Sequence, residues 1–198
     1  MNVILGGAPA SPGTQAIKIM LMGNKIGTDV SGSEPTIALP AGTIAVATPI
    51  ALSSSDDAAT YFGLGSEVHI MSRAVFAQYP NATVYGIAVA EGGGAYASVV
   101  CTFATTASAS YTIRVRACGE VIDVPVATSD TATTIATNVC AAVNAVTWLP
   151  YYAQFVLGAV TFSAKCNGPR GNELTVLLSF VSSSGTEIVE PICERLGV

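Results

Sequence analysis

Charged side chains are scarce in this sequence of 198 residues, where they make up 11% of the total, and basic ones are the scarcest. Eight Lys and Arg stand against thirteen Asp and Glu, and the basic residues form no cluster. Binding to a row of phosphates or to an anionic lipid surface needs such a cluster. The composition therefore argues against direct binding of nucleic acid and against docking on a membrane.

Long apolar runs are also missing, because Gly, Pro, Ser or a charged residue interrupts each one before the roughly 18 residues that span a bilayer. Residues 1–7 lack the basic start and the longer apolar core of a signal peptide. We therefore expect a protein that is made and kept in a cytoplasm.

Histidine and paired cysteine are nearly absent, with one histidine and no CxxC motif in the chain. A zinc site needs clustered soft ligands, whereas the five cysteines are scattered. We predict no metal site and free thiols, with the thiol on the helix expected near residue 140 buried as a small hydrophobe. The cysteines are Cys101, Cys118, Cys140, Cys166 and Cys193.

No set of residues has the pattern of a catalytic site. A hydrolase triad would have to use His69, but no Gly-x-Ser-x-Gly motif is present, so we interpret His69 as a surface or interface residue. The run from Gly63 to Ser66 lacks both a following Lys and a preceding strand, so it indicates a helix end and a new helix cap, not a phosphate loop. We predict no enzyme activity and no catalytic or cofactor-binding residue.

The remaining charged groups have ordinary interpretations. Asp56 and Asp57 fall at a helix start, where the helix dipole favours negative charge. Lys165 and Arg170 flank a tight loop and could bind an anion, but exposed cations beside a turn are common. Three glutamates at spacings of three and four predict a solvated face: Glu187, Glu190 and Glu194.

What the sequence does contain is enough apolar material for a substantial core, at 51% of residues, with many Ala, Thr, Val, Ser and Gly. Such a weakly charged surface is suited to contact other protein. We predict a turn-rich arm over residues 1–16, with a buried strand at 17–22 after it. We then predict a short strand at 43–47, helices after Ser53–Asp57 and after Ser66, and a strand at 83–89. Because helices connect the first and the last strand of this unit, we expect those two strands to be parallel.

The glycine run at residues 92–94 predicts a domain boundary. Beyond it we predict a small, mostly antiparallel sheet covered on one face by one helix. The fold class is therefore α+β, with residues 17–92 and 182–198 in an α/β part and residues 93–181 in a β-rich domain. The predicted elements beyond the boundary are strands at 99–103, 111–116, 121–126, 151–156, 160–164 and 174–180 and a helix at 131–144.

The order of several motifs resembles the N-terminal part of contractile phage tail sheath proteins of the Mu-like family. Residues 17–25, Ile-Lys-Ile-Met-Leu-Met-Gly-Asn-Lys, are similar to that family's first strand. The run Ser53-Ser54-Ser55-Asp56-Asp57-Ala58 followed by Phe62-Gly63-Leu64-Gly65-Ser66 is similar to its serine-aspartate segment and Phe-Gly-x-Gly-Ser motif. Further similar segments are Pro80–Ala88, Ile113–Val126, Thr131–Ala136 and Val160–Leu174, so that the resemblance covers roughly residues 17–180 in the family's order.

The resemblance implies a structural subunit that packs with its copies into a helical sleeve around a tail tube, in contact with tube and baseplate proteins. It implies assembly in the host cytoplasm, a final place in the virion, and contraction of the sleeve that drives the tube through the host envelope. Residues 93–181 would be the inserted sheath domain. Family members are commonly longer, so the sequence would be a truncated sheath protein, a protease-resistant or designed fragment, or a related protein without the tube-facing part. Of these we expect a fragment with the outer domains, which would fold alone yet neither polymerise nor contract.

Two other functions remain open. The Thr- and Ser-rich, charge-poor strands also fit a glycan- or ligand-binding β-rich module of a phage surface protein. An enzyme is the third alternative, and it has the least support because no titratable residues converge.

Overall fold

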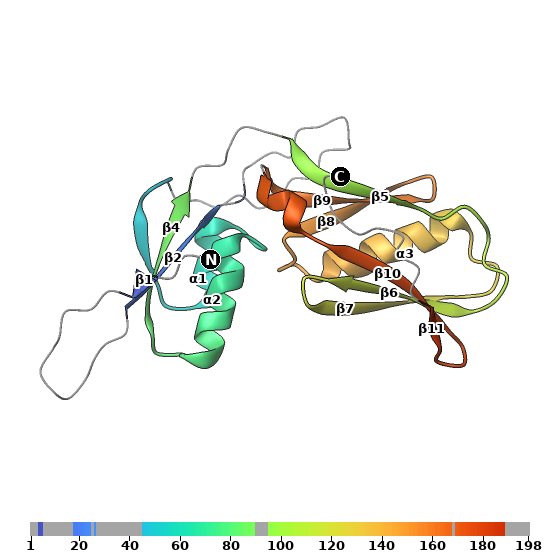
Figure 1. Ribbon diagram of the computed structural model, residues 1–198, viewed down its shortest axis with the longest axis horizontal. Coiled ribbons are helices and arrows are strands. Elements are labelled where there is room, and N and C mark those ends of the chain that lie inside the picture. Colours follow the sequence, from blue (N-terminus) through green and yellow to red (C-terminus); the bar gives the residue numbers. More distant parts are fainter. Residues whose placement is uncertain are drawn as a thin grey trace, which may run out of the picture. The chain divides into compact units, whose positions relative to one another are not determined.

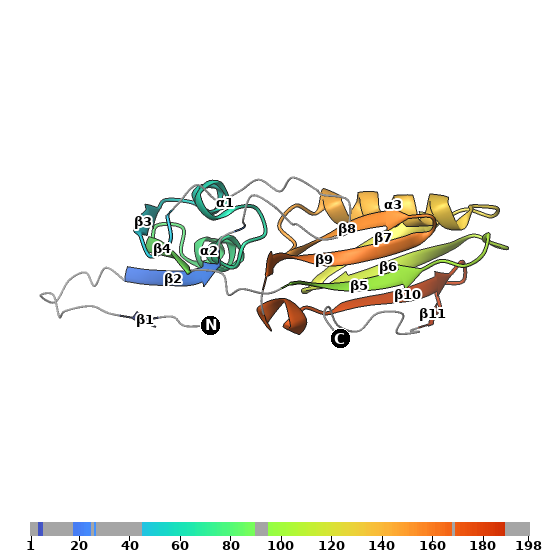
Figure 2. The same ribbon diagram turned by 90° about the horizontal axis from the view of Figure 1, so that it is seen from above.

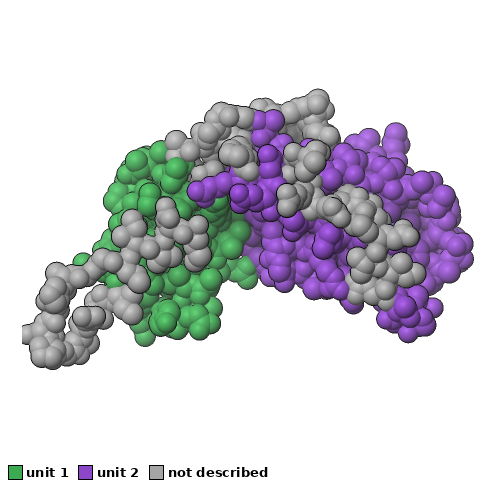
Figure 3. All heavy atoms as spheres, viewed as in Figure 1, with its two compact units in different colours: residues 1–92 green, residues 93–198 purple. Residues whose placement is uncertain are grey.

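The computed structural model describes residues 4–5, 18–24, 26, 45–89, 95–167 and 169–188. It confirms the predicted α+β class (Figure 1). The chain divides into two compact units, residues 1–92 and residues 93–198 (Figure 3). Each unit has a hydrophobic core of its own.

The first unit is built on a four-stranded sheet in the order β1-β2-β4-β3. The central strands β2 and β4 are parallel, as the sequence predicts, and β1 and β3 pair antiparallel at the edges. The strand bounds are β1 Ile4–Leu5, β2 Lys18–Asn24, β3 Pro49–Leu52 and β4 Thr83–Val89.

Strand β3 lies later in the chain than the sequence predicts. The described part of the predicted strand at 43–47 forms a turn, in which Ala47 has a φ of 60°. That left-handed conformation is incompatible with a continuous strand. The prediction was therefore wrong at this position, and the strand begins at Pro49.

Two helices, α1 (Ser55–Phe62) and α2 (Glu67–Gln78), lie on one face of this sheet (Figure 2). Phe62 is fully buried and lies against Gly86 of β4, where a Cβ atom would come within 2.6 Å of its ring. The helix and the strand approach so closely only because residue 86 has no side chain. The other buried apolar residues of this core are Ile19, Leu21, Leu52, Ala58, Val68, Val84 and Ala88.

The second unit contains two sheets where the sequence predicts one. The orders are β11-β10-β6-β7 and β5-β9-β8, and every pairing is antiparallel. Apolar residues from both sheets belong to one core, which periodicity along a single strand cannot reveal. The bounds are β5 Tyr96–Thr102, β6 Tyr111–Ala117, β7 Glu120–Val126, β8 Tyr151–Val156, β9 Ala159–Asn167, β10 Val176–Ser182 and β11 Glu187–Ile188.

Helix α3 (Ala132–Ala145) packs its apolar stripe into the same core. Thr131 caps its first turn by accepting from the Thr134 N–H, and Ile135, Val139 and Val143 are buried at the spacing of one helical face. A short 3₁₀ helix, η1 (Pro169–Glu173), connects β9 to β10.

Residues 182–188, the described part of the predicted segment 182–198, differ from the prediction in their placement, and residues 189–198 lie outside the described residues. Strand β11 pairs with β10, with Val181 opposite Glu187, so the described end of the chain belongs to the second unit and not to the first. A hairpin with a neighbouring strand is a shorter connection than a return to another unit. Residues 1–3 and 6–16 of the predicted arm lie outside the described residues.

Candidate interaction surfaces

The single histidine is a structural residue and not the surface or interface residue that we predict from the sequence. His69 is only 4% exposed, and its Nδ1 accepts a hydrogen bond of 3.0 Å from the Gly65 N–H. The backbone N–H of His69 donates to the Ser66 hydroxyl at 3.2 Å. The bond from Gly65 closes the turn between α1 and α2, and a single-sequence pattern could not reveal it.

The glycine-rich turn is a helix end followed by a new cap, as predicted. Gly63 ends α1 with a φ of 92°, and its N–H donates to the Ala59 carbonyl. Ser66 caps α2. At the start of α1 the Asp57 carboxylate accepts from the N–H and the hydroxyl of Ser53, and these bonds lower the pKa of Asp57.

Lys165 is buried, which the sequence does not predict. It is 7% exposed, and its Nζ donates to the Thr147 carbonyl at 2.8 Å. Burial lowers its pKa to about 8. The prediction of an exposed cation was wrong for Lys165 because both faces of β9 are covered, whereas Arg170 on η1 is exposed.

The other predicted groups fall into simple classes. Cys101, Cys118, Cys140 and Cys166 are free thiols, and burial in α3 raises the pKa of Cys140 to about 12. Glu187 lies in β11 and not on a helix, and Cys193, Glu190 and Glu194 lie outside the described residues. Within the described ranges, no three His, Cys, Asp or Glu residues are close enough together to hold a metal ion.

On the face of the first unit's sheet opposite to α1 and α2, the middle of β2 and β4 carries apolar side chains. Met20 and Met22 of β2 lie beside Tyr85 and Ile87 of β4, and all four are only partly buried. Val89, on the same face, is 38% exposed. We call this set the helix-free face, and such a face is suited to contact other protein.

A second apolar feature is the turn between β8 and β9. Val156 pairs with Ala159, so Leu157 and Gly158 form a two-residue loop, with φ values of 47° and 87°. These values match a type I′ turn, which favours Asn, Asp or Gly at both positions. Leu157 nevertheless occupies the first position and is 89% exposed, and its neighbour Val156 is 54% exposed.

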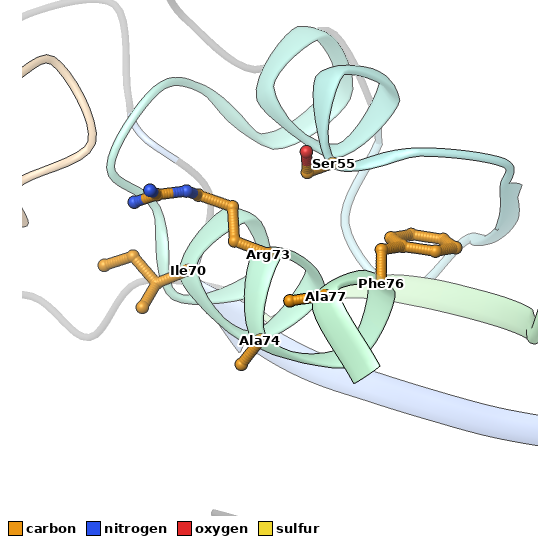
Figure 4. Close-up of a pocket in the computed structure, with 6 residues that line it drawn as sticks. All are labelled: Ser55, Ile70, Arg73, Ala74, Phe76 and Ala77. Carbon is orange, nitrogen blue, oxygen red and sulfur yellow. The ribbon is translucent and has the colours of Figure 1, made fainter. Parts of the chain in front are cut away.

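A third feature is a shallow hollow on the outer side of α2, with a volume of about 620 Å³ (Figure 4). Ile70, Ala74, Phe76 and Ala77 supply apolar lining, and the Arg73 guanidinium lies beside them. Ser55 of α1 completes the lining. The sequence signal for this hollow was the pair of alanines on the exposed side of α2, which leaves room that larger side chains would fill.

Comparison with known proteins gave no matching family model, and no significantly similar curated protein was found. Among the helices of the described ranges, none is long and apolar enough to cross a membrane.

Proposed function

We propose that this chain is a structural subunit of a contractile phage tail sheath. It would pack with its copies into a helical sleeve around the tail tube, and contraction of the sleeve would drive the tube through the host envelope. The observation that carries the proposal is the resemblance of motifs over roughly residues 17–180 to the Mu-like sheath family, in the order of that family.

The positions of those motifs in the fold support the proposal. The first strand motif lies in β2, the serine-aspartate segment starts α1, and the Phe62–Ser66 motif forms the turn that His69 closes. Each motif therefore serves as a cap, a turn or a buried strand. A protein that is selected for shape has this pattern, because the residues that matter most to it are those that fix the backbone.

The surface also supports self-association. The helix-free face, the Leu157 turn and the α2 hollow present apolar side chains on a molecule with 11% charged residues. Contacts between copies of a subunit bury such side chains. In the proposed sleeve each copy would use them against its neighbours, and tube and baseplate proteins would be further partners.

The experiment is to express the whole reading frame that encodes this sequence and to image the product by negative-stain electron microscopy. We expect hollow tubes with a helical repeat, and we expect an antibody against residues 95–167 to decorate them along their length. A product that stays dispersed under all assembly conditions contradicts the proposal.

The second candidate is a glycan- or ligand-binding module of a phage surface protein, which the Thr- and Ser-rich strands of the second unit favour. A glycan array distinguishes the two. The sheath proposal predicts no saturable binding to any glycan and co-assembly of the labelled 198-residue chain into the tubes. Saturable glycan binding without co-assembly would favour the second candidate.

A further inference from the structure

The turn between α1 and α2 is closed by an acceptor that can take up a proton. Ser66 is the N-cap of α2, and its hydroxyl accepts from the backbone N–H of His69, the third residue of the helix. In the other direction, the His69 Nδ1 accepts from the Gly65 N–H at 3.0 Å. The pair is similar to a capping box, in which a Glu or Gln at the third helical position supplies the second acceptor. Here an imidazole supplies it, to the residue before the cap.

An imidazole nitrogen accepts a hydrogen bond only while it carries no proton. Both ring nitrogens of a protonated histidine are donors, so a protonated Nδ1 and the Gly65 N–H would face each other as two donors across 3.0 Å. His69 is 4% exposed, so water cannot replace the lost acceptor unless the turn opens. Histidine ordinarily changes its charge between about pH 5 and pH 8. A protonated His69 and a closed turn therefore exclude each other.

The turn holds the end of α1 at the core of the first unit. Phe62, the last residue of α1, is fully buried, and its carbonyl accepts from the Ile26 N–H at 2.9 Å. Across the turn the Ser66 N–H donates to the Gly63 carbonyl at 3.1 Å. An opening at Gly65 would loosen these positions next to Phe62. The second unit cannot respond in the same way, because His69 is the one histidine of the sequence.

Other charged and titratable groups lie on the elements that pack against α2. Among the described residues they are Asp56, Asp57 and Tyr61 of α1, Lys18 of β2, Tyr85 of β4, and Glu67 and Arg73 of α2 itself. The Asp57 carboxylate is bonded to Ser53, at the opposite end of α1 from the turn. The Glu67 side chain lies beside Gly23 of β2. All of these groups stay unchanged when residue 69 alone is replaced, so variants at that position separate the imidazole from them.

We propose that the turn from Gly63 to His69 is an acid-sensitive lock. With a neutral imidazole the Gly65 bond keeps α1 and α2 joined in their closed arrangement. Proton uptake at Nδ1 removes that bond, opens the turn and loosens the end of α1, while the second unit stays folded. The inference goes beyond the sheath proposal and does not depend on it.

Solution NMR of the 198-residue protein tests the lock at the bond itself. At pH 7.5 a scalar coupling between the Gly65 nitrogen and the His69 Nδ1 should show the hydrogen bond. Titration to about pH 4.5 should protonate the ring and abolish the coupling, and the protection factor of the Gly65 amide should fall at least about tenfold. The Phe103 amide of the second unit, which is bonded to the Gly158 carbonyl, should keep its protection.

Two variants keep an acceptor at residue 69 that does not titrate in this range. His69→Asn places an amide oxygen where Nδ1 lies, and His69→Gln supplies the usual residue of a capping box. Both variants share every carboxylate of the unmodified chain. In a variant that folds, the Gly65 amide should therefore have nearly the same protection factor at both ends of the titration.

Three outcomes overturn the inference. The first is a Gly65 amide whose protection and coupling survive protonation of the ring. The second is a ring that stays neutral, with a closed turn, down to pH 4.5. The third is an equal loss of protection in the unmodified chain and in a folded variant. The titration of the unmodified chain decides between lock and no lock even where a variant does not fold.

Discussion

At the scale of single residues, two polar groups that we predict on the surface are buried in the fold. Lys165 and His69 are 7% and 4% exposed, and each hydrogen bonds to a backbone group of a nearby loop or turn. The spacing of apolar residues does not predict that either side chain is buried, because burial here depends on which elements cover the strand or the helix. Charge type alone therefore predicts the wrong environment.

Lys165 should make stability depend on pH. Its pKa falls from 10.5 to about 8 in the folded protein, so the folded state binds fewer protons than the unfolded chain between these values. The burial cost, about 3 kcal/mol, is fully present below pH 8 and disappears as pH rises toward 10.5. Lys165→Met should therefore gain stability over the unmodified protein at pH 7, and the gain should shrink by about that amount at high pH.

The measurement is urea denaturation of both proteins across that pH range. The loss of the hydrogen bond to Thr147 adds an offset that does not change with pH. Lys165→Arg is the control, because arginine keeps its charge, and its free energy of unfolding should not show the rise that the unmodified protein shows. A constant difference between Lys165→Met and the unmodified protein at every pH would contradict the prediction.

Leu157 should carry a stability cost. A leucine at a φ of 47° is strained, and asparagine adopts this conformation more readily. Leu157→Asn should raise the free energy of unfolding by roughly 0.5–1 kcal/mol. Chemical denaturation of dilute protein measures this, with Val121→Asn in a regular strand as a control that should not gain. A loss of stability in Leu157→Asn would contradict the prediction.

At the scale of elements, Asn144 connects α3 to the edge of a sheet. Its Nδ2 donates to the Ala153 carbonyl at 2.8 Å, and its Oδ1 accepts from the Ala153 N–H at 2.9 Å. Both edge-facing backbone groups of one β8 residue are thereby satisfied. The contact fixes the helix along the strand, which apolar packing alone would specify less tightly.

Asn144→Ala should cost about 2 kcal/mol, because two part-buried hydrogen bonds are lost. Asn138→Ala is the matched control, since Asn138 is exposed on the same helix and its replacement should be nearly neutral or slightly stabilising. Guanidinium denaturation followed by circular dichroism compares them. Equal effects of the two changes would mean that the side-chain bonds to Ala153 contribute nothing.

Elements with a regular period could be predicted from the sequence. Strand β4 and helix α3 fall within a residue of their predicted bounds, because alternation of buried residues defines the strand and an apolar stripe defines the helix. The division of the second unit into two sheets could not be predicted from the sequence. The patterns of β6 and β9 each predict a strand, but they do not show that the two strands belong to different sheets. The α2 hollow was not predicted either, although the two alanines on the exposed side of α2 were a sequence signal for it.

At the scale of the whole molecule, the two units have separate cores. Phe62 centres one of them, and Phe162 packs edge-on against Tyr151 in the other, with ring centroids 6.1 Å apart. A core of its own is the condition for a unit to unfold on its own. The glycine run at 92–94 marks the division in the sequence.

Gly86→Ala should therefore destabilise only the first unit. The added Cβ would lie 2.6 Å from the Phe62 ring, and relief of that overlap should cost about 1–3 kcal/mol. Calorimetry should show two transitions, of which only one moves. Val160→Ala, at a fully buried position of the second core, should move the other transition, with a cost of about 2–3 kcal/mol. A single transition that both changes lower together would contradict this separation.

The bonds from Asn144 to Ala153 have a consequence for solutions of this protein at high concentration. A bare strand at a sheet border is a template on which a foreign strand can add, and cross-β aggregates grow in this way. On β8 that template is interrupted at its middle by a side-chain amide. A foreign strand that approaches this border therefore meets a side-chain amide in place of free backbone groups at Ala153, which should hinder strand addition there.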